Sequence, residues 1–223
     1  MIKNRTTQLV FQTAYCVLAF IGLVNSLGYF DEMFHANFYV YYTNLSNYIC
    51  FGTMLAILVG TIKAANKKED GYCNTAPTFN FMCVILIMVT FFVYNILLAK
   101  DYSVVEYFTD LNNMLMHVIL PIMFVLNWVL FYEHGKMKWY WPLLCVIMPL
   151  IYVAFILIRA AIIGPGTKAI LYPYFFLNVA ELGWAGFFGW IMVLLVVFVA
   201  LGYLLYLLDH IRNIKAKIKK SGV

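Results

Sequence analysis

The chain has 223 residues, of which 65% are apolar or aromatic and only 11% are charged. Soluble globular domains hold about 45–50% apolar and about 25% charged residues, so this composition excludes a disordered chain and a nucleic-acid-binding domain and disfavours an ordinary cytosolic enzyme. The formal net charge of +5 matters less than the side of a membrane on which the charges fall. We therefore expect an integral membrane protein.

Six apolar segments are long enough to cross a bilayer, whose core of about 30 Å requires roughly 20 residues per helix. We expect these spans at about 8–30, 41–62, 79–99, 111–132, 139–161 and 187–208. The runs lack the alternation of β-barrel strands, and no linker or internal repeat divides them. The prediction is an all-α polytopic membrane protein in which residues 1–223 form a single bundle of six transmembrane helices.

The loops between these spans differ in charge. Twelve of the 15 Lys and Arg residues fall on one side of the membrane if the loops alternate, and the other three are Lys100, Arg159 and Lys168. The positive-inside rule then predicts that both termini are cytoplasmic. Residues 209–223 form a basic cytoplasmic tail, which we expect to lie against anionic lipid headgroups.

The five cysteines have no CxxC spacing and form no Cys/His cluster of the kind that binds zinc. We therefore expect no metal and no cofactor. The expected partners are membrane lipids and no nucleic acid, and the sequence does not set an oligomeric state.

Polar side chains are costly inside a bilayer, so their depth carries information. In five of the six spans they lie toward the outer end, and the inner half has little beyond Gln12, Thr13 and Asn127. The outer group comprises Asn25, Ser26, Thr43, Asn44, Ser46, Asn47, Tyr94, Asn95, Asp110, Asn112, Asn113, His117 and Arg159. This asymmetry predicts a polar cavity that opens toward the outer face.

Spacing brings two of these groups onto common helix faces. Thr43, Ser46 and Asn47 stand at i, i+3 and i+4. Asn113 and His117 are four residues apart, and Asp110 lies two turns before the histidine. The Thr43 hydroxyl and the His117 imidazole lie at similar depths, so we expect that they can meet.

Structural roles would also account for these residues. A membrane threonine usually bonds the carbonyl one turn back, and an asparagine such as Asn47 or Asn95 often ties two helices together. An intramembrane histidine is a functional candidate by default, yet an interhelical hydrogen bond would also explain His117. Arg159 could snorkel to the interface. The other histidines, His35, His134 and His210, lie in loops or at a helix end and are poor candidates.

Three segments, taken in order, resemble a known family. They are YYTNLSNYICF (41–51), NMLMHVILP (113–121), and YPYFFLN (172–178) after the apolar stretch 139–159. Together they resemble the androgen-induced/FAR-type family of membrane hydrolases and its bacterial relatives. The resemblance implies a threonine hydrolase in a bacterial plasma membrane that cleaves fatty acid esters of hydroxy fatty acids, with Thr43 as nucleophile and His117 as base.

This chemistry needs an activated hydroxyl and donors for the oxyanion. Imidazole titrates near neutral pH and can take the Thr43 proton and return it to the leaving alkoxide. Asn47, or backbone amides at the outer start of the second span, could donate to the oxyanion. Asn113 or Asp110 could orient His117.

The substrate of such an enzyme would reach the site from the bilayer. Its free carboxylate could be held by Arg159 or Lys168 at the outer interface. A small transporter would also gather polar residues around a cavity, although the chain shows no inverted repeat and no pair of broken helices. A non-enzymatic lipid-binding membrane protein is the other alternative.

Overall fold

The computed structural model describes residues 1–30, 32–99, 102–166 and 169–221, and at 104 and 212–221 the backbone alone. Within these ranges the fold is all-α, with one isolated β-bridge between Cys73 and Tyr132. Six of the helical segments are long and apolar enough to cross a membrane. The predicted fold class, a bundle of six apolar helices, is confirmed.

The helices follow one another along the chain with short connections. They are α1 (Arg5–Ser26), η1 (Phe38–Val40), α2 (Tyr42–Asn66), α3 (Pro77–Val93), η2 (Tyr94–Leu98), α4 (Val104–Thr109), α5 (Leu111–Met114), η4 (Leu115–Ile119), α6 (Leu120–Phe131), α7 (Trp141–Leu144), α8 (Ile147–Ile163), η5 (Phe175–Leu177) and α9 (Val179–Ser221). Three spans are composite: α3 continues into η2, α5 continues through η4 into α6, and α7 leads into α8.

The first span lies a few residues earlier than the sequence predicted. The Asn4 side chain accepts a hydrogen bond from the Thr7 N–H at 2.9 Å and so caps α1 before Arg5. The helix ends at Ser26, and the chain turns at Gly28, where φ is +83°. A Cβ at Gly28 would lie 1.8 Å from the Met33 carbonyl oxygen, so only glycine fits this turn.

The last helix is longer than its apolar run. Helix α9 covers Val179–Ser221, with non-helical backbone at Gly183 near its start. Residues 209–221, which the sequence predicted as a separate basic tail, therefore belong to the same helix. Hydropathy located the apolar part of this helix correctly. It does not show where the helix ends, because a helix can continue into polar sequence.

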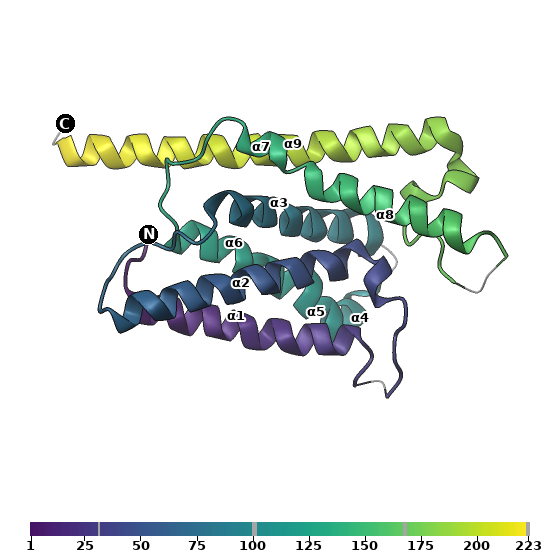
Figure 1. The fold of residues 1–223 in the computed structure, drawn as a ribbon, viewed down its shortest axis with the longest axis horizontal. Helices are drawn as coiled ribbons and strands as arrows, with labels where there is room; N and C mark the ends of the chain where they lie inside the picture. Colours follow the sequence, from purple (N-terminus) through teal and green to yellow (C-terminus); the bar gives the residue numbers. More distant parts are fainter. Residues whose placement is uncertain (31, 100–101, 167–168, 222–223) are drawn as a thin grey trace.

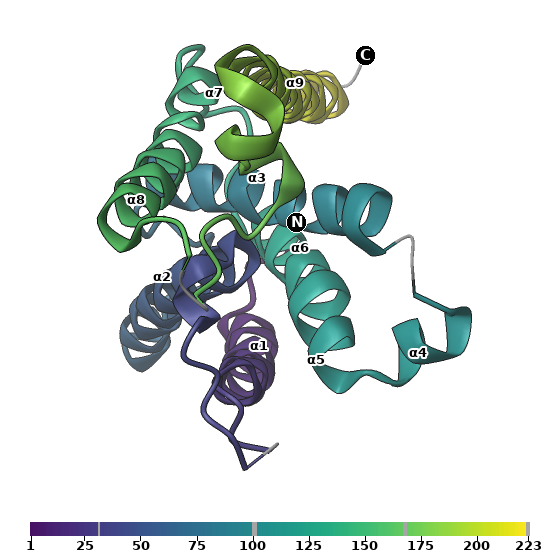
Figure 2. The same cartoon turned by 90° about the vertical axis from the view of Figure 1, so that its right-hand side faces the viewer.

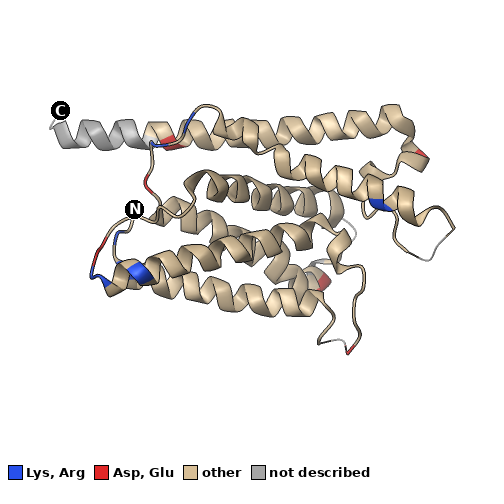
Figure 3. Ribbon diagram, in the orientation of Figure 1, with Lys and Arg blue, Asp and Glu red and all other residues tan. Residues whose placement is uncertain are grey.

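The bundle has an inner group of four helices and an outer pair (Figures 1 and 2). Helices α1, α2, α3 and α6 pack against one another, while α8 and α9 lie outside α3. Both termini lie at one end of the bundle, which we call the terminal end. The described residues of the segments 27–41, 99–110 and 164–178 lie at the opposite end, which we call the loop end. Lys and Arg gather at the terminal end, with Arg159 the exception among the described cations (Figure 3).

A buried ion pair joins α9 to the loop after α6 at the terminal end. His134 Nδ1 lies 2.7 Å from Asp209 Oδ1, and both side chains are almost completely buried. The other carboxylate oxygen accepts the Gly135 N–H, and His134 Nε2 lies 3.0 Å from the Val129 carbonyl oxygen. Both ring nitrogens therefore lie within hydrogen-bond distance of an oxygen atom.

We expect Asp209→Asn to lower the free energy of unfolding by roughly 1–3 kcal/mol, because an amide cannot replace both buried carboxylate oxygens, one beside the His134 ring and one accepting the Gly135 N–H. Thermal unfolding in detergent micelles measures this loss. Glu133→Gln is the matched control, since the Glu133–Lys136 pair spans 3.8 Å at the surface and should contribute less than about 0.5 kcal/mol. Equal melting temperatures for the two variants would contradict the prediction.

Candidate active site

A cavity of about 750 Å³ lies at the loop end of the bundle. Thr43 from α2 and His117 from η4 both line it, together with Asp110 and Asn113 from the start of the fourth span. These residues come from segments far apart in the sequence. The structure thus brings four of the predicted site residues to one polar cavity.

The Thr43 hydroxyl lacks the backbone hydrogen bond that four other helical threonines make. Thr53, Thr61, Thr90 and Thr109 each donate to the carbonyl four residues back, at 2.8–3.2 Å. Thr43 stands in the first turn of α2, where the residue four back precedes the helix. Among the described residues its hydroxyl makes no such bond, so the usual structural role of a membrane threonine does not apply to it.

Two side chains of the Thr-x-x-Ser-Asn segment hydrogen-bond the backbone carbonyl of Thr43. Ser46 Oγ donates to Thr43 O at 2.9 Å, and Asn47 Nδ2 donates to the same oxygen at 2.8 Å. The shared helix face predicted from the spacing is therefore used to position the threonine backbone, while its hydroxyl stays available to the cavity.

Asn47 also ties α2 to the helix that carries His117. Its amide donates to Met116 O at 3.0 Å, so both of its N–H bonds are engaged by carbonyl oxygens. Asn47 does not line the cavity. In this arrangement the backbone N–H groups at the start of α2 are the better-placed oxyanion donors, because the first bond of that helix runs from Leu45 N to Tyr41 O.

Pro121 explains why the Met116 carbonyl oxygen needs a hydrogen-bond donor from another helix. Residues Leu115–Ile119 form a π-helical turn in which the Leu120 N–H bonds Leu115 O, five residues back. The next bond of that pattern would run to Met116 O from Pro121, which has no N–H. The proline likewise frees His117 O, which accepts from Asn95 Nδ2 at 3.3 Å.

The histidine ring itself is held by an aromatic stack. Tyr94 and His117 lie face to face, with ring centroids 3.5 Å apart and planes 13° from parallel. Tyr94 begins the second π-helical turn, Tyr94–Leu98, which faces the first. Such turns are frequent at functional sites, and here one carries His117 and the other carries its stacking partner Tyr94.

Asp110 and Asn113 serve the backbone around the histidine. Asp110 caps α5 by accepting the Asn113 N–H at 3.0 Å, and Asn113 Nδ2 donates to Tyr107 O at 2.8 Å. The Tyr107 hydroxyl in turn donates to Asn95 Oδ1. The side chains of Asp110 and Asn113 do not bond the imidazole, while the Asn113 backbone lies within hydrogen-bonding reach of the ring. Both residues therefore position His117 through its helix.

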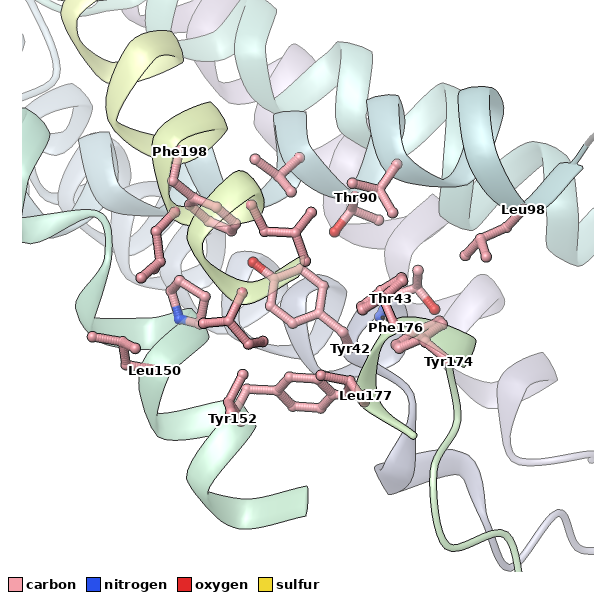
Figure 4. Close-up of a pocket in the computed structure, with 17 residues that line it drawn as sticks. Tyr42, Thr43, Thr90, Leu98, Leu150, Tyr152, Tyr174, Phe176, Leu177 and Phe198 are labelled. Atoms are coloured by element: carbon pink, nitrogen blue, oxygen red, sulfur yellow. Dashed lines mark hydrogen bonds between the residues drawn. The ribbon is translucent and has the colours of Figure 1, made fainter. Parts of the chain in front are cut away.

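A second pocket, apolar and about 60 Å³ in volume, lies between α3, α8 and α9 (Figure 4). Thr43, Leu98 and Tyr174 line both this pocket and the polar cavity. Figure 4 shows Thr43 beside Tyr174 and Phe176 at one end, with Leu150 and Phe198 at the other. Thr43 therefore stands where an apolar pocket meets a polar cavity.

Tyr174 contacts Thr43 directly, although the residue pattern alone did not single it out. The Thr43 N–H donates to the Tyr174 hydroxyl oxygen at 3.4 Å. Burial raises the pKa of Tyr174 to about 12, and hydrogen bonds from Thr43 only partly oppose this effect. The phenol is therefore neutral across the physiological range. Its position in the Tyr-Pro-aromatic segment 172–178 was the feature of the sequence that could have identified it.

Of the two predicted carboxylate-binding residues, Arg159 is not brought to the cavity. Arg159 is buried, donates to Ile170 O at 2.5 Å and to the Tyr39 hydroxyl at 3.4 Å, and does not line the cavity. It ties α8 to the two neighbouring loops. Lys168 lies outside the described residues. In the part of the chain that is described, no three His, Cys, Asp or Glu side chains are grouped to hold a metal ion.

Comparisons with known proteins do not place this chain in a family, since no protein-family model, no curated protein and no solved structure matches it.

Proposed function

We propose that this chain is an intramembrane hydrolase of lipid esters, with Thr43 as nucleophile and His117 as base. The observation that carries this proposal is the position of Thr43, which lines both an apolar pocket and the polar cavity that holds His117. An ester of a fatty acid has the same division, with an apolar chain on one side of the carbonyl. Fatty acid esters of hydroxy fatty acids, or similar acyl esters, are the proposed substrates.

The reaction would run in two steps. His117 takes the proton from Thr43 Oγ while Oγ bonds the ester carbon, and the proton passes to the leaving alkoxide as its bond to that carbon breaks. Water activated by the same imidazole then cleaves the acyl-threonine. N–H groups at the start of α2, which have no partner within the helix, stabilise the negative oxygen. The substrate reaches the site from the bilayer through the apolar pocket.

We expect a fluorophosphonate probe, which modifies activated hydroxyl groups, to label the wild-type protein and to fail with Thr43→Ala. Hydrolysis of a fatty acid ester of a hydroxy fatty acid should fall by roughly 10⁴-fold in Thr43→Ala and in His117→Gln, because each removes half of the nucleophilic pair. Thr53→Ala is the matched control, since the Thr53 hydroxyl is used by the Ile49 carbonyl. Labelling and turnover in purified micelles are the measurements.

Two results would overturn the hydrolase proposal. One is a wild-type protein that is neither labelled nor able to cleave any acyl ester. The other is solute flux in liposomes that persists in Thr43→Ala, which would favour the transporter alternative.

The apolar pocket should select long acyl chains. Leu194 lines the pocket, and Leu194→Trp places a larger side chain in it. We expect this variant to lower kcat/KM for long-chain esters by roughly tenfold or more, since excluding two methylene groups of the acyl chain from the pocket costs about 1.6 kcal/mol. Short-chain esters should be cleaved as before. Val193→Trp is the control, because Val193 is exposed on the outer face of the same helix. An equal loss for both chain lengths would contradict this assignment.

We also propose that both termini are cytoplasmic in a bacterial plasma membrane and that the cavity opens on the opposite side. The support is the gathering of Lys and Arg at the terminal end (Figure 3).

The orientation predicts that a membrane-impermeant maleimide will label Val105→Cys at the loop end in intact cells. Lys67→Cys at the terminal end should react only after permeabilisation. The five native cysteines are buried and give a low background. The reverse labelling pattern would refute the orientation.

A further inference from the structure

Tyr174 is held rigidly at the junction of the two cavities. Its ring stacks on Phe176, with centroids 5.1 Å apart and planes 8° from parallel, and Tyr41 packs against it edge-on. Only 9% of the residue is exposed. Its hydroxyl oxygen receives the Thr43 N–H, so it lies beside the proposed nucleophile.

The Tyr174 hydroxyl is not committed to a backbone carbonyl. A phenol can accept and donate at once, and here the oxygen accepts from the Thr43 N–H. Two other buried phenols donate to carbonyl oxygens: Tyr152 bonds Val40 O at 2.8 Å, and Tyr132 bonds Thr75 O at 2.9 Å. Among the described residues Tyr174 makes no such bond to a carbonyl, and the Thr43 side chain lies within hydrogen-bonding reach of its hydroxyl.

We propose that the Tyr174 hydroxyl donates a hydrogen bond to the oxyanion that forms when Thr43 attacks an ester carbonyl. This inference rests on the proposed hydrolase function. In the tetrahedral intermediate the oxyanion and Thr43 Oγ are bonded to the same carbon. A donor beside Thr43 therefore reaches the place where negative charge develops. The phenolic proton stays on Tyr174, and His117 alone carries the transferred proton.

Two features suit Tyr174 to this role. The Thr43 N–H bond and the Phe176 stack orient the hydroxyl before substrate arrives, so little reorganisation is needed during the reaction. The high pKa that burial produces keeps the phenol protonated, and thus a donor, throughout the range in which His117 could act as a base.

The test is Tyr174→Phe, compared with Tyr132→Phe, which removes a buried phenol that lines neither cavity. We expect Tyr174→Phe to lower kcat by about 10²–10³-fold with little change in KM, as for the loss of one oxyanion donor. A boronic acid that forms a tetrahedral adduct at Thr43 should bind correspondingly more weakly. A non-cleavable ether analogue of the substrate should bind as before. Tyr132→Phe should keep kcat within a few-fold.

The outcomes separate this inference from the proposed function. If the wild type cleaves esters, Thr43→Ala does not, and Tyr174→Phe keeps its kcat, the oxyanion role is overturned while the hydrolase stands. If Tyr174→Phe weakens the ether analogue as much as the boronic acid and lowers the melting temperature, Tyr174 has only a structural role. If the wild type neither reacts with the probe nor cleaves esters, the hydrolase proposal fails and this inference fails with it.

Discussion

The side-chain amide of Asn47 is the contact on which the geometry of the proposed site depends. One of its N–H bonds holds the carbonyl of Thr43, and the other holds the carbonyl of Met116, next to His117. The second bond is needed because Pro121 cannot supply a backbone donor inside that helix. A buried carbonyl left without a partner costs about 1–3 kcal/mol. The Asn47 bond avoids this cost at Met116 O, the carbonyl for which Pro121 supplies no donor. The proposed nucleophile and the proposed base are thereby held by a single side chain.

The place of Thr43 along its helix matters as much as its depth. One turn further on, its hydroxyl would find a carbonyl four residues back, as the hydroxyl of Thr53 does. In the first turn that acceptor is missing from the helix, and the first N–H groups lack intrahelical partners, so the Thr43 N–H bonds the Tyr174 hydroxyl instead. The same position therefore frees the hydroxyl from the backbone and places hydrogen-bond donors next to it, as the proposed acyl transfer requires.

The sequence predicted the apolar helices and the depth of the polar residues, because hydrophobic length and the cost of buried polarity are local properties. It could not predict the rotation of each helix, so it offered both Asn47 and the backbone amides at the start of the second span as oxyanion donors, and the Asn47 amide is engaged by two carbonyl oxygens. The π-helical turn at His117 depends on both Pro121 and a donor from another helix. The His134–Asp209 pair was missed for a similar reason, since a loop histidine and a helix-end aspartate meet only after α9 has packed.

The location of the cavity resolves a conflict built into the proposed chemistry. Ester hydrolysis needs water, whereas the substrate's acyl chain lies in the bilayer. A site at the centre of the bundle would lack water, and a site in a loop would lack a hydrophobic surface for the chain. Thr43 lies at the boundary, with an apolar pocket between α3, α8 and α9 on one side and a polar cavity on the other. A hydroxyl at the first turn of a membrane helix is one of the few positions that can face both environments, because the apolar body of the bundle ends where the loops begin.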